Sequence, residues 1–170
     1  MSPTTTRDLR IKWTVYALAI ALLLFLHTLT TAHVRVQGVV PFLPPLLLAV
    51  VASMEERLEG VVFGLVFGLL CDLALTAPVP WLYTVSFTAA ALLVSFIARS
   101  VLQPGFLCSL VSSAVAFALI DLILAAVLLL AGRSSLAAIL DRALRELLLS
   151  LPLLAVCHPL LAFLHRRFTL

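Results

Sequence analysis

Charged residues are scarce in this 170-residue chain. They make up 11% of it, while 64% of the residues are hydrophobic. A soluble domain carries roughly 25% charged and about 45–50% apolar residues. A water-soluble fold of this length has no interior large enough for so much apolar surface. Lipid suits the composition, because a spanning helix satisfies its backbone hydrogen bonds internally. We therefore expect one integral membrane domain over residues 1–170.

Several features that mark other protein classes are missing from the sequence. Its net charge of +3 comes from scattered basic residues, which argues against a nucleic-acid-binding surface. It contains no nucleophile–base pair, no glycine-rich phosphate loop and no cluster with metal-ligand spacing. We expect no enzyme, no cofactor, and no catalytic, cofactor-binding or metal site. The cysteines lack a CxxC pair and are expected to pack as small apolar residues; they are Cys71, Cys108 and Cys157.

What the chain does contain is a series of apolar segments. A transmembrane helix needs about 20 such residues. The segments predict an all-α, compact bundle of about six transmembrane helices over residues 13–32, 39–54, 60–77, 81–98, 106–132 and 147–165. The first is too long for the roughly 7–15-residue apolar region of a signal peptide, so we expect a retained helix.

Six spans place both ends of the chain on one side of the membrane. That side would carry seven lysine and arginine residues, and the other side four. Basic residues are enriched in cytoplasmic loops, so both termini are expected to be cytoplasmic.

The stretch Arg133–Glu146 lies between the last two predicted spans. Its apolar residues recur at helical spacing opposite charged ones. This pattern predicts a short interfacial helix on the membrane surface before the last span. We expect Arg142 and Arg145 to meet lipid phosphates there.

Four residues of the third segment form a row with a spacing of four: Gly60, Gly64, Gly68 and Asp72. Residues at this spacing share one helix face, and glycine lets a second helix approach closely in lipid. The row predicts either packing inside the bundle or contact with a partner's helix. We expect the glycines nearer the cytoplasm to pack internally and the neighbourhood of Asp72 to face a partner or a pocket.

Asp72 and Asp121 are the two acids expected inside the membrane, where an ionised carboxylate is costly. Their expected depths are comparable, so they could share a polar pocket. No cation is expected at the depth of Asp121, which predicts a neutral side chain at pH 7. It would either bond to a hydroxyl such as that of Ser112 or Ser113, or form part of a proton or ligand site.

Residues 44–100 combine several of these features in a fixed order. A proline-led apolar helix and a charged turn are followed by the glycine row, which continues as Gly68-Leu-Leu-Cys-Asp72-Leu73. A tight turn and an apolar helix ending in Arg99 come next. This order resembles the MreD family of rod shape-determining membrane proteins, whose third helix carries glycines ahead of a Gly-Leu-Leu-x-Asp-Leu element.

The resemblance implies a scaffold of the bacterial cell-elongation machinery, the elongasome, in the cytoplasmic (inner) membrane. Such a scaffold supports peptidoglycan synthesis and cell shape without being an enzyme. Implied partners are an MreC-like bitopic protein and, through it, the RodA glycosyltransferase, a penicillin-binding transpeptidase and MreB. The alternative is the substrate-binding membrane subunit of an energy-coupling-factor vitamin transporter, also a six-helix protein. That function needs polar and aromatic groups that converge at one depth.

Overall fold

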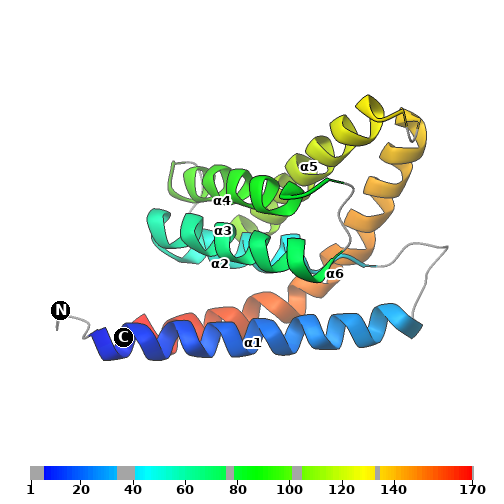
Figure 1. Ribbon diagram of the computed structural model, residues 1–170. Coiled ribbons are helices and arrows are strands. Elements are labelled where there is room, and N and C mark those ends of the chain that lie inside the picture. The colour runs from blue at the N-terminus through cyan, green and yellow to red at the C-terminus, as the bar shows by residue number, and fades with distance from the viewer. Residues whose placement is uncertain (1–5, 34–40, 76–78, 101–104, 133–134, 170) are drawn as a thin grey trace.

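The computed structural model describes residues 6–33, 41–75, 79–100, 105–132 and 135–169, and within these ranges all side chains except those of 6–10, 26, 27, 29–33, 168 and 169. All regular secondary structure in these ranges is helical, which confirms the all-α prediction (Figure 1). The helices are α1 (Thr6–His33), α2 (Pro44–Met54), α3 (Arg57–Ala74), α4 (Leu82–Ser100), α5 (Phe106–Leu130) and α6 (Leu136–Thr169).

Three of these helices, α4, α5 and α6, are long and apolar enough to cross a membrane. The other three predicted spans fall short for different reasons. The described apolar part of α1 covers only Ile11–Phe25, and α2 has 11 residues. In α3, the charges of Arg57, Glu59 and Asp72 lie within 18 residues. The chain therefore has the character of a membrane protein, and the residues that the structure describes contain three candidate spans rather than the six predicted.

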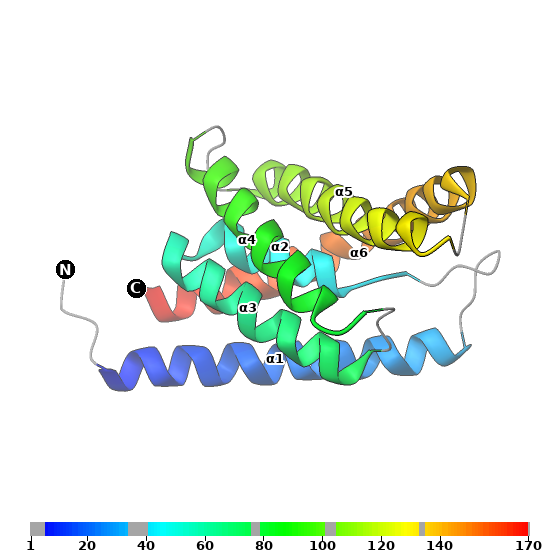
Figure 2. The same ribbon diagram turned by 45° about the horizontal axis from the view of Figure 1, so that its top comes forward.

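The short helix α2 forms the centre of the molecule. Its first nine residues, 44–52, are all buried. A helix that is apolar all round is stable only when it is enclosed on every side. Helices α3, α4, α5 and α6 pack around it (Figure 2). Pro44 and Pro45 lie in its first turn, where a missing N–H costs little because that group has no partner within the helix.

The glycine row joins α3 to its neighbours. A Cβ atom placed on Gly64 would lie 2.5 Å from the Cβ of Ala91 in α4. One on Gly68 would lie 2.7 Å from the Cα of Thr84, also in α4. One on Gly60 would lie 3.2 Å from a backbone atom of α2. The glycine face is therefore occupied by helices of the same chain. Of the two predicted alternatives, packing inside the bundle is the one that the structure shows for these glycines.

Helix α6 is continuous from Leu136 to Thr169 and forms an antiparallel hairpin with α5 (Figure 1). The prediction of a separate interfacial helix is therefore wrong, because residues 136–146 are the first turns of α6. Its predicted first residues, 133 and 134, lie outside the described ranges. The sequence changes from amphipathic to apolar near Leu147, but no glycine or proline interrupts it before Pro152. A change in polarity alone does not end a helix.

Pro152 and Pro159 lie inside α6, and Figure 1 shows that this helix changes direction along its length. Interior prolines bend helices because they remove a hydrogen bond and crowd the preceding turn. The bent C-terminal half of α6 lies beside α1. Near the bend, the buried hydroxyl of Ser150 accepts a hydrogen bond of 2.8 Å from the N–H of Phe42. This bond ties the chain entering α2 to α6.

We predict that Gly64→Leu abolishes the folded state, because a side chain there collides with Ala91. Gly64→Ala should lower the midpoint of thermal unfolding, since overpacking costs about 1–3 kcal/mol. The measurement is the loss of the monodisperse size-exclusion peak on heating in detergent. Gly105→Ala is the matched control, because nothing lies within 4 Å of a Cβ at that position. An unchanged midpoint for Gly64→Ala would show that α3 and α4 are less closely packed than described.

Candidate functional site

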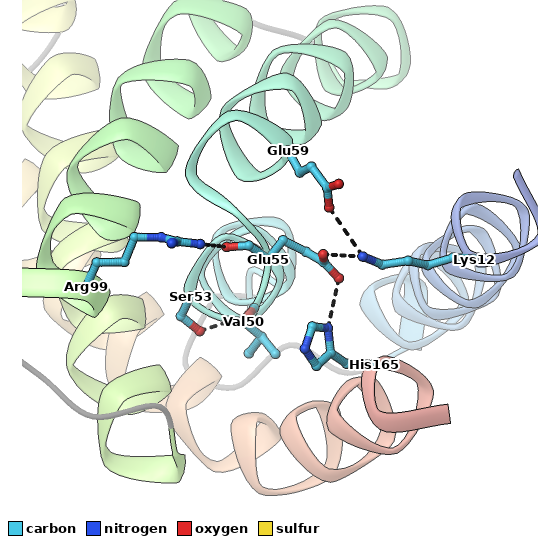
Figure 3. Close-up of polar contacts among 7 residues, drawn as sticks. All are labelled: Lys12, Val50, Ser53, Glu55, Glu59, Arg99 and His165. Atoms are coloured by element: carbon cyan, nitrogen blue, oxygen red, sulfur yellow. Dashed lines mark hydrogen bonds and ion pairs between the residues drawn. The ribbon is translucent and has the colours of Figure 1, made fainter. Parts of the chain in front are cut away.

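The densest group of charged side chains surrounds Glu55, at the end of α2. This carboxylate is only 2% exposed. One oxygen pairs with the ammonium group of Lys12 from α1, and the other lies 2.9 Å from Nδ1 of His165 in α6 (Figure 3). Glu59, at the start of α3, lies 3.3 Å from the same ammonium group. We call Lys12, Glu55, Glu59 and His165 the charge cluster.

Arg99 completes the surroundings of Glu55 from the end of α4. Its guanidinium donates a hydrogen bond of 2.9 Å to the Glu55 carbonyl (Figure 3). The last carbonyls of a helix have no partner within the helix, and cations are favourable at that end of the helix dipole. The N–H of Glu55 donates to the Val51 carbonyl at 2.9 Å. Both the side chain and the backbone of Glu55 are therefore fully bonded.

The members of the charge cluster shift one another's pKa values. Burial alone would raise the pKa of Glu55, but the hydrogen bonds from His165 and Lys12 outweigh it and lower this pKa to about 2. Glu55 is therefore ionised at neutral pH and can only accept, so Nδ1 of His165 must be the donor. Burial and the neighbouring Glu55 carboxylate raise the pKa of Glu59. The pKa of Lys12 is also raised, because its two carboxylate partners outweigh its own desolvation.

Hydroxyl groups continue this polar region into the bundle. The Ser53 hydroxyl donates to the Val50 carbonyl at 2.8 Å and lies 3.3 Å from that of Ser109 in α5. Ser109 in turn lies 3.0 Å from Nδ1 of His158 in α6. One turn along α1 from Lys12, the hydroxyl of Tyr16 is buried without a hydrogen-bond partner among the described residues. The polar groups thus link α2, α5 and α6 on the same side of the molecule.

The sequence analysis did not identify this cluster, although a signal for it was present. Glu55 and Glu59 form the charged turn between the predicted spans 39–54 and 60–77, and His165 is the last residue of the predicted span 147–165. The predicted topology already placed Lys12, this turn and the end of the last helix on one side of the membrane. Glu55, directly after a wholly apolar helix, was the residue for which a buried partner was needed.

The structure gives Asp72 a different role from the expected one. Its carboxylate accepts hydrogen bonds from the N–H groups of Tyr83 and Thr84 at 3.0 and 2.8 Å, and from the Thr84 hydroxyl at 2.6 Å. These groups belong to the first turn of α4, whose N–H groups lack partners within the helix. Asp72 therefore caps α4 from the neighbouring helix. These contacts lie within the chain, and the expectation that the neighbourhood of Asp72 faces a partner or a pocket stays a prediction.

Asp121 lies in a second polar site, far along the chain from Asp72. It lines a cavity of about 180 Å³ between α5 and α6, together with Arg142 and Glu146. The two acids therefore do not share a pocket. The expected absence of a cation near Asp121 is wrong, because Arg142 lines the same cavity. Glu146 lines it as well, and the neutral side chain of Asp121 stays a prediction. The topology misled us here, since it placed Arg142 on the membrane surface.

Arg142 and Arg145 are both held by acids of their own helix. Arg142 donates to Glu146 at 2.7 Å and Arg145 to Asp141 at 3.0 Å. Both pairs have the i, i+4 spacing that brings side chains together on one helix face. These contacts were not foreseen, and the predicted contact of the arginines with lipid phosphates stays a prediction.

The remaining sequence predictions concern cysteine and metal. Cys71, Cys108 and Cys157 are buried and free, as predicted. Within the described ranges, no three His, Cys, Asp or Glu side chains are grouped so that they could hold a metal ion.

Comparison with protein-family models, with curated proteins and with solved structures finds no match for this chain. Any functional assignment therefore rests on the residues and the contacts described above.

We predict that Glu55→Gln strongly destabilises the bundle. Removing one partner of a buried ion pair costs about 3–5 kcal/mol, which corresponds to roughly 10 °C in unfolding midpoint. Glu56→Gln is the matched control, because Glu56 is the exposed neighbour of Glu55. The readout is the thermal midpoint of the size-exclusion peak at pH 7. Equal midpoints for the two variants would show that the cluster contributes nothing.

The same cluster predicts a pH dependence. The pKa of Glu55 is lower in the folded state than its ordinary 4.5, so its stabilising contribution is complete above that value. It is lost as the pH falls towards 2. Glu59 acts in the opposite sense, because its pKa is raised. The unfolding midpoint of the wild type minus that of Glu55→Gln should therefore shrink between pH 5 and pH 3. A constant difference would contradict the lowered pKa.

For the cap on α4 we predict that Asp72→Leu lowers the unfolding midpoint more than Thr84→Val. The first change removes all three hydrogen bonds to the carboxylate, and the second removes one. Loss of a helix cap costs about 0.5–2 kcal/mol, and hydrogen bonds to a charged group about 1.5–3 kcal/mol. If Asp72→Leu leaves the midpoint unchanged, the cap is not a stabilising contact.

Proposed function

We propose that this chain is a non-enzymatic membrane scaffold of the MreD type, which acts in the bacterial cell-elongation complex. The supporting observation is that the residues that carry the resemblance hold helices together. The glycine row packs α3 against α4. Asp72 caps the start of α4, and Arg99 binds the carbonyl of Glu55, which directly follows α2.

Bonding of the motif residues to neighbouring helices of the same chain suits a scaffold better than a catalytic site. Catalytic and ligand-binding groups converge on a cavity where they can meet a substrate. Here both oxygens of Asp72 are occupied by backbone or hydroxyl groups of the same chain, and the guanidinium of Arg99 binds a backbone carbonyl. The motif therefore fixes the shape of a helical body, and shape is the property by which a scaffold positions its partners.

The partner in this proposal is an MreC-like bitopic protein, through which RodA, the transpeptidase and MreB are reached. Its transmembrane helix would not use the glycine face, since α2 and α4 already occupy it. Another part of the α3 surface carries exposed apolar side chains, including Leu58, Leu65 and Leu73. In lipid, the close fit of such a face with a partner's helix drives association.

The vitamin-transporter alternative receives less support from the cavities. The cavity that holds Asp121, of about 180 Å³, is smaller than the roughly 300–1,000 Å³ of typical ligand pockets. A larger cavity beside α1 has almost wholly apolar walls. A vitamin with several polar groups would find few partners there.

The test is co-purification with the MreC-like protein encoded in the same genome. We predict that the tagged chain retains the full-length MreC-like protein after detergent extraction, and loses it when the transmembrane helix of that protein is deleted. An unrelated polytopic membrane protein serves as control bait. Equal retention by the control bait, or no retention by this chain, would contradict the proposal. A stoichiometric vitamin in the purified protein would favour the transporter.

A further inference from the structure

A cavity of about 410 Å³ lies between α1 and α3, and its lining is almost entirely apolar. Ala17, Ile20 and Ala21 form part of the α1 wall, and Val66 and Leu70 part of the α3 wall. The cavity is open on one side, so it is a groove rather than a closed chamber. In Figure 2, α1 runs along the edge of the molecule, outside the helices that enclose α2.

The groove exists because α1 packs closely against α6 but not against α3. At one end, the ring of Trp13 stacks on that of Phe63 at a centroid distance of 6.4 Å. This pair of rings separates the two helices. Farther along, Ala17 and Ala21 have no side chains long enough to fill the gap. Small residues normally permit close helix contact in lipid, yet here they leave space.

The length and the position of the groove match one leaflet of a bilayer. Its α1 wall runs from Trp13 to Leu24, which is about 16 Å of helix. Half of the roughly 30 Å hydrocarbon core has nearly the same thickness. The Trp13 end lies beside the charge cluster, since the Lys12 ammonium group is 5.7 Å from the centre of the Trp13 ring. The groove thus begins at charged groups, and its other end lies about 16 Å away along α1.

We propose that this groove holds one acyl chain of a phospholipid from the leaflet on the side of the charge cluster. If a methylene group fills roughly the 30 Å³ that a water molecule has in the liquid, 410 Å³ holds a chain of about fourteen such groups. A partner's helix, about 10 Å across and long enough to cross both leaflets, is too wide and too long for this space. The proposal does not rest on the scaffold function.

Trp13 provides the probe, because the chain has only two tryptophans and Trp81→Phe leaves Trp13 as the sole emitter. The delipidated Trp81→Phe protein in detergent micelles is titrated with phosphatidylcholine that carries bromine on its acyl chains. We expect quenching of Trp13 fluorescence to saturate near one lipid per protein, and the unbrominated lipid to reverse it. Quenching that rises in proportion to the lipid fraction without saturation would overturn the proposal.

A pair of double variants tests the location in the same background. Ala17→Phe with Ala21→Phe fills the groove, whereas Leu18→Phe with Leu22→Phe adds the same rings to the exposed face of α1. We expect at least tenfold weaker apparent binding in the first and unchanged binding in the second. Equal binding in two monodisperse proteins would overturn the proposal. If the filled variant does not fold, the saturation test above still decides.

Discussion

A buried carboxylate at the end of a wholly apolar helix is the constraint around which this molecule is arranged. Glu55 follows directly after α2, whose burial carries the acid into the interior. An ionised group there is stable only when partners surround it. They come from both ends of the chain, as Lys12 and His165, and the end of α4 supplies Arg99. Because each partner lies near the end of a different helix, satisfying one carboxylate fixes where those helices meet.

The need to pair charged side chains and free backbone groups also accounts for the motif in α3 and α4. The glycines remove side chains so that the two helices can touch, and their contact brings Asp72 to the start of α4. Asp72 then provides the hydrogen bonds that the first turn of α4 lacks. The residues that suggest the MreD family are therefore parts of a helix-packing device. This packing role is the observation that supports the scaffold function that we propose.

The sequence predicted the positions of the helices better than the contacts between them. Apolar segments and turn residues placed α3, α4 and α5 within a few residues, because hydropathy is a local property. The start of α6 was missed because polarity changes at Leu147 while the helix does not end. Neither the cap by Asp72 nor the cavity that Asp121 shares with Arg142 was predicted. Both depend on how each helix is rotated about its axis and which neighbour it meets, and a single sequence leaves these open.

The central claim is that Glu55 and Lys12 stabilise the bundle through each other, and a double-mutant cycle tests it most directly. The measurement is the unfolding midpoint at pH 7 of the wild type, Lys12→Met, Glu55→Gln and the double variant. The account predicts that the double variant loses less stability than the two single variants together, because each single change already breaks the Lys12–Glu55 pair. A decrease in the unfolding midpoint of the double variant equal to the sum of the decreases in the two single variants would contradict the claim.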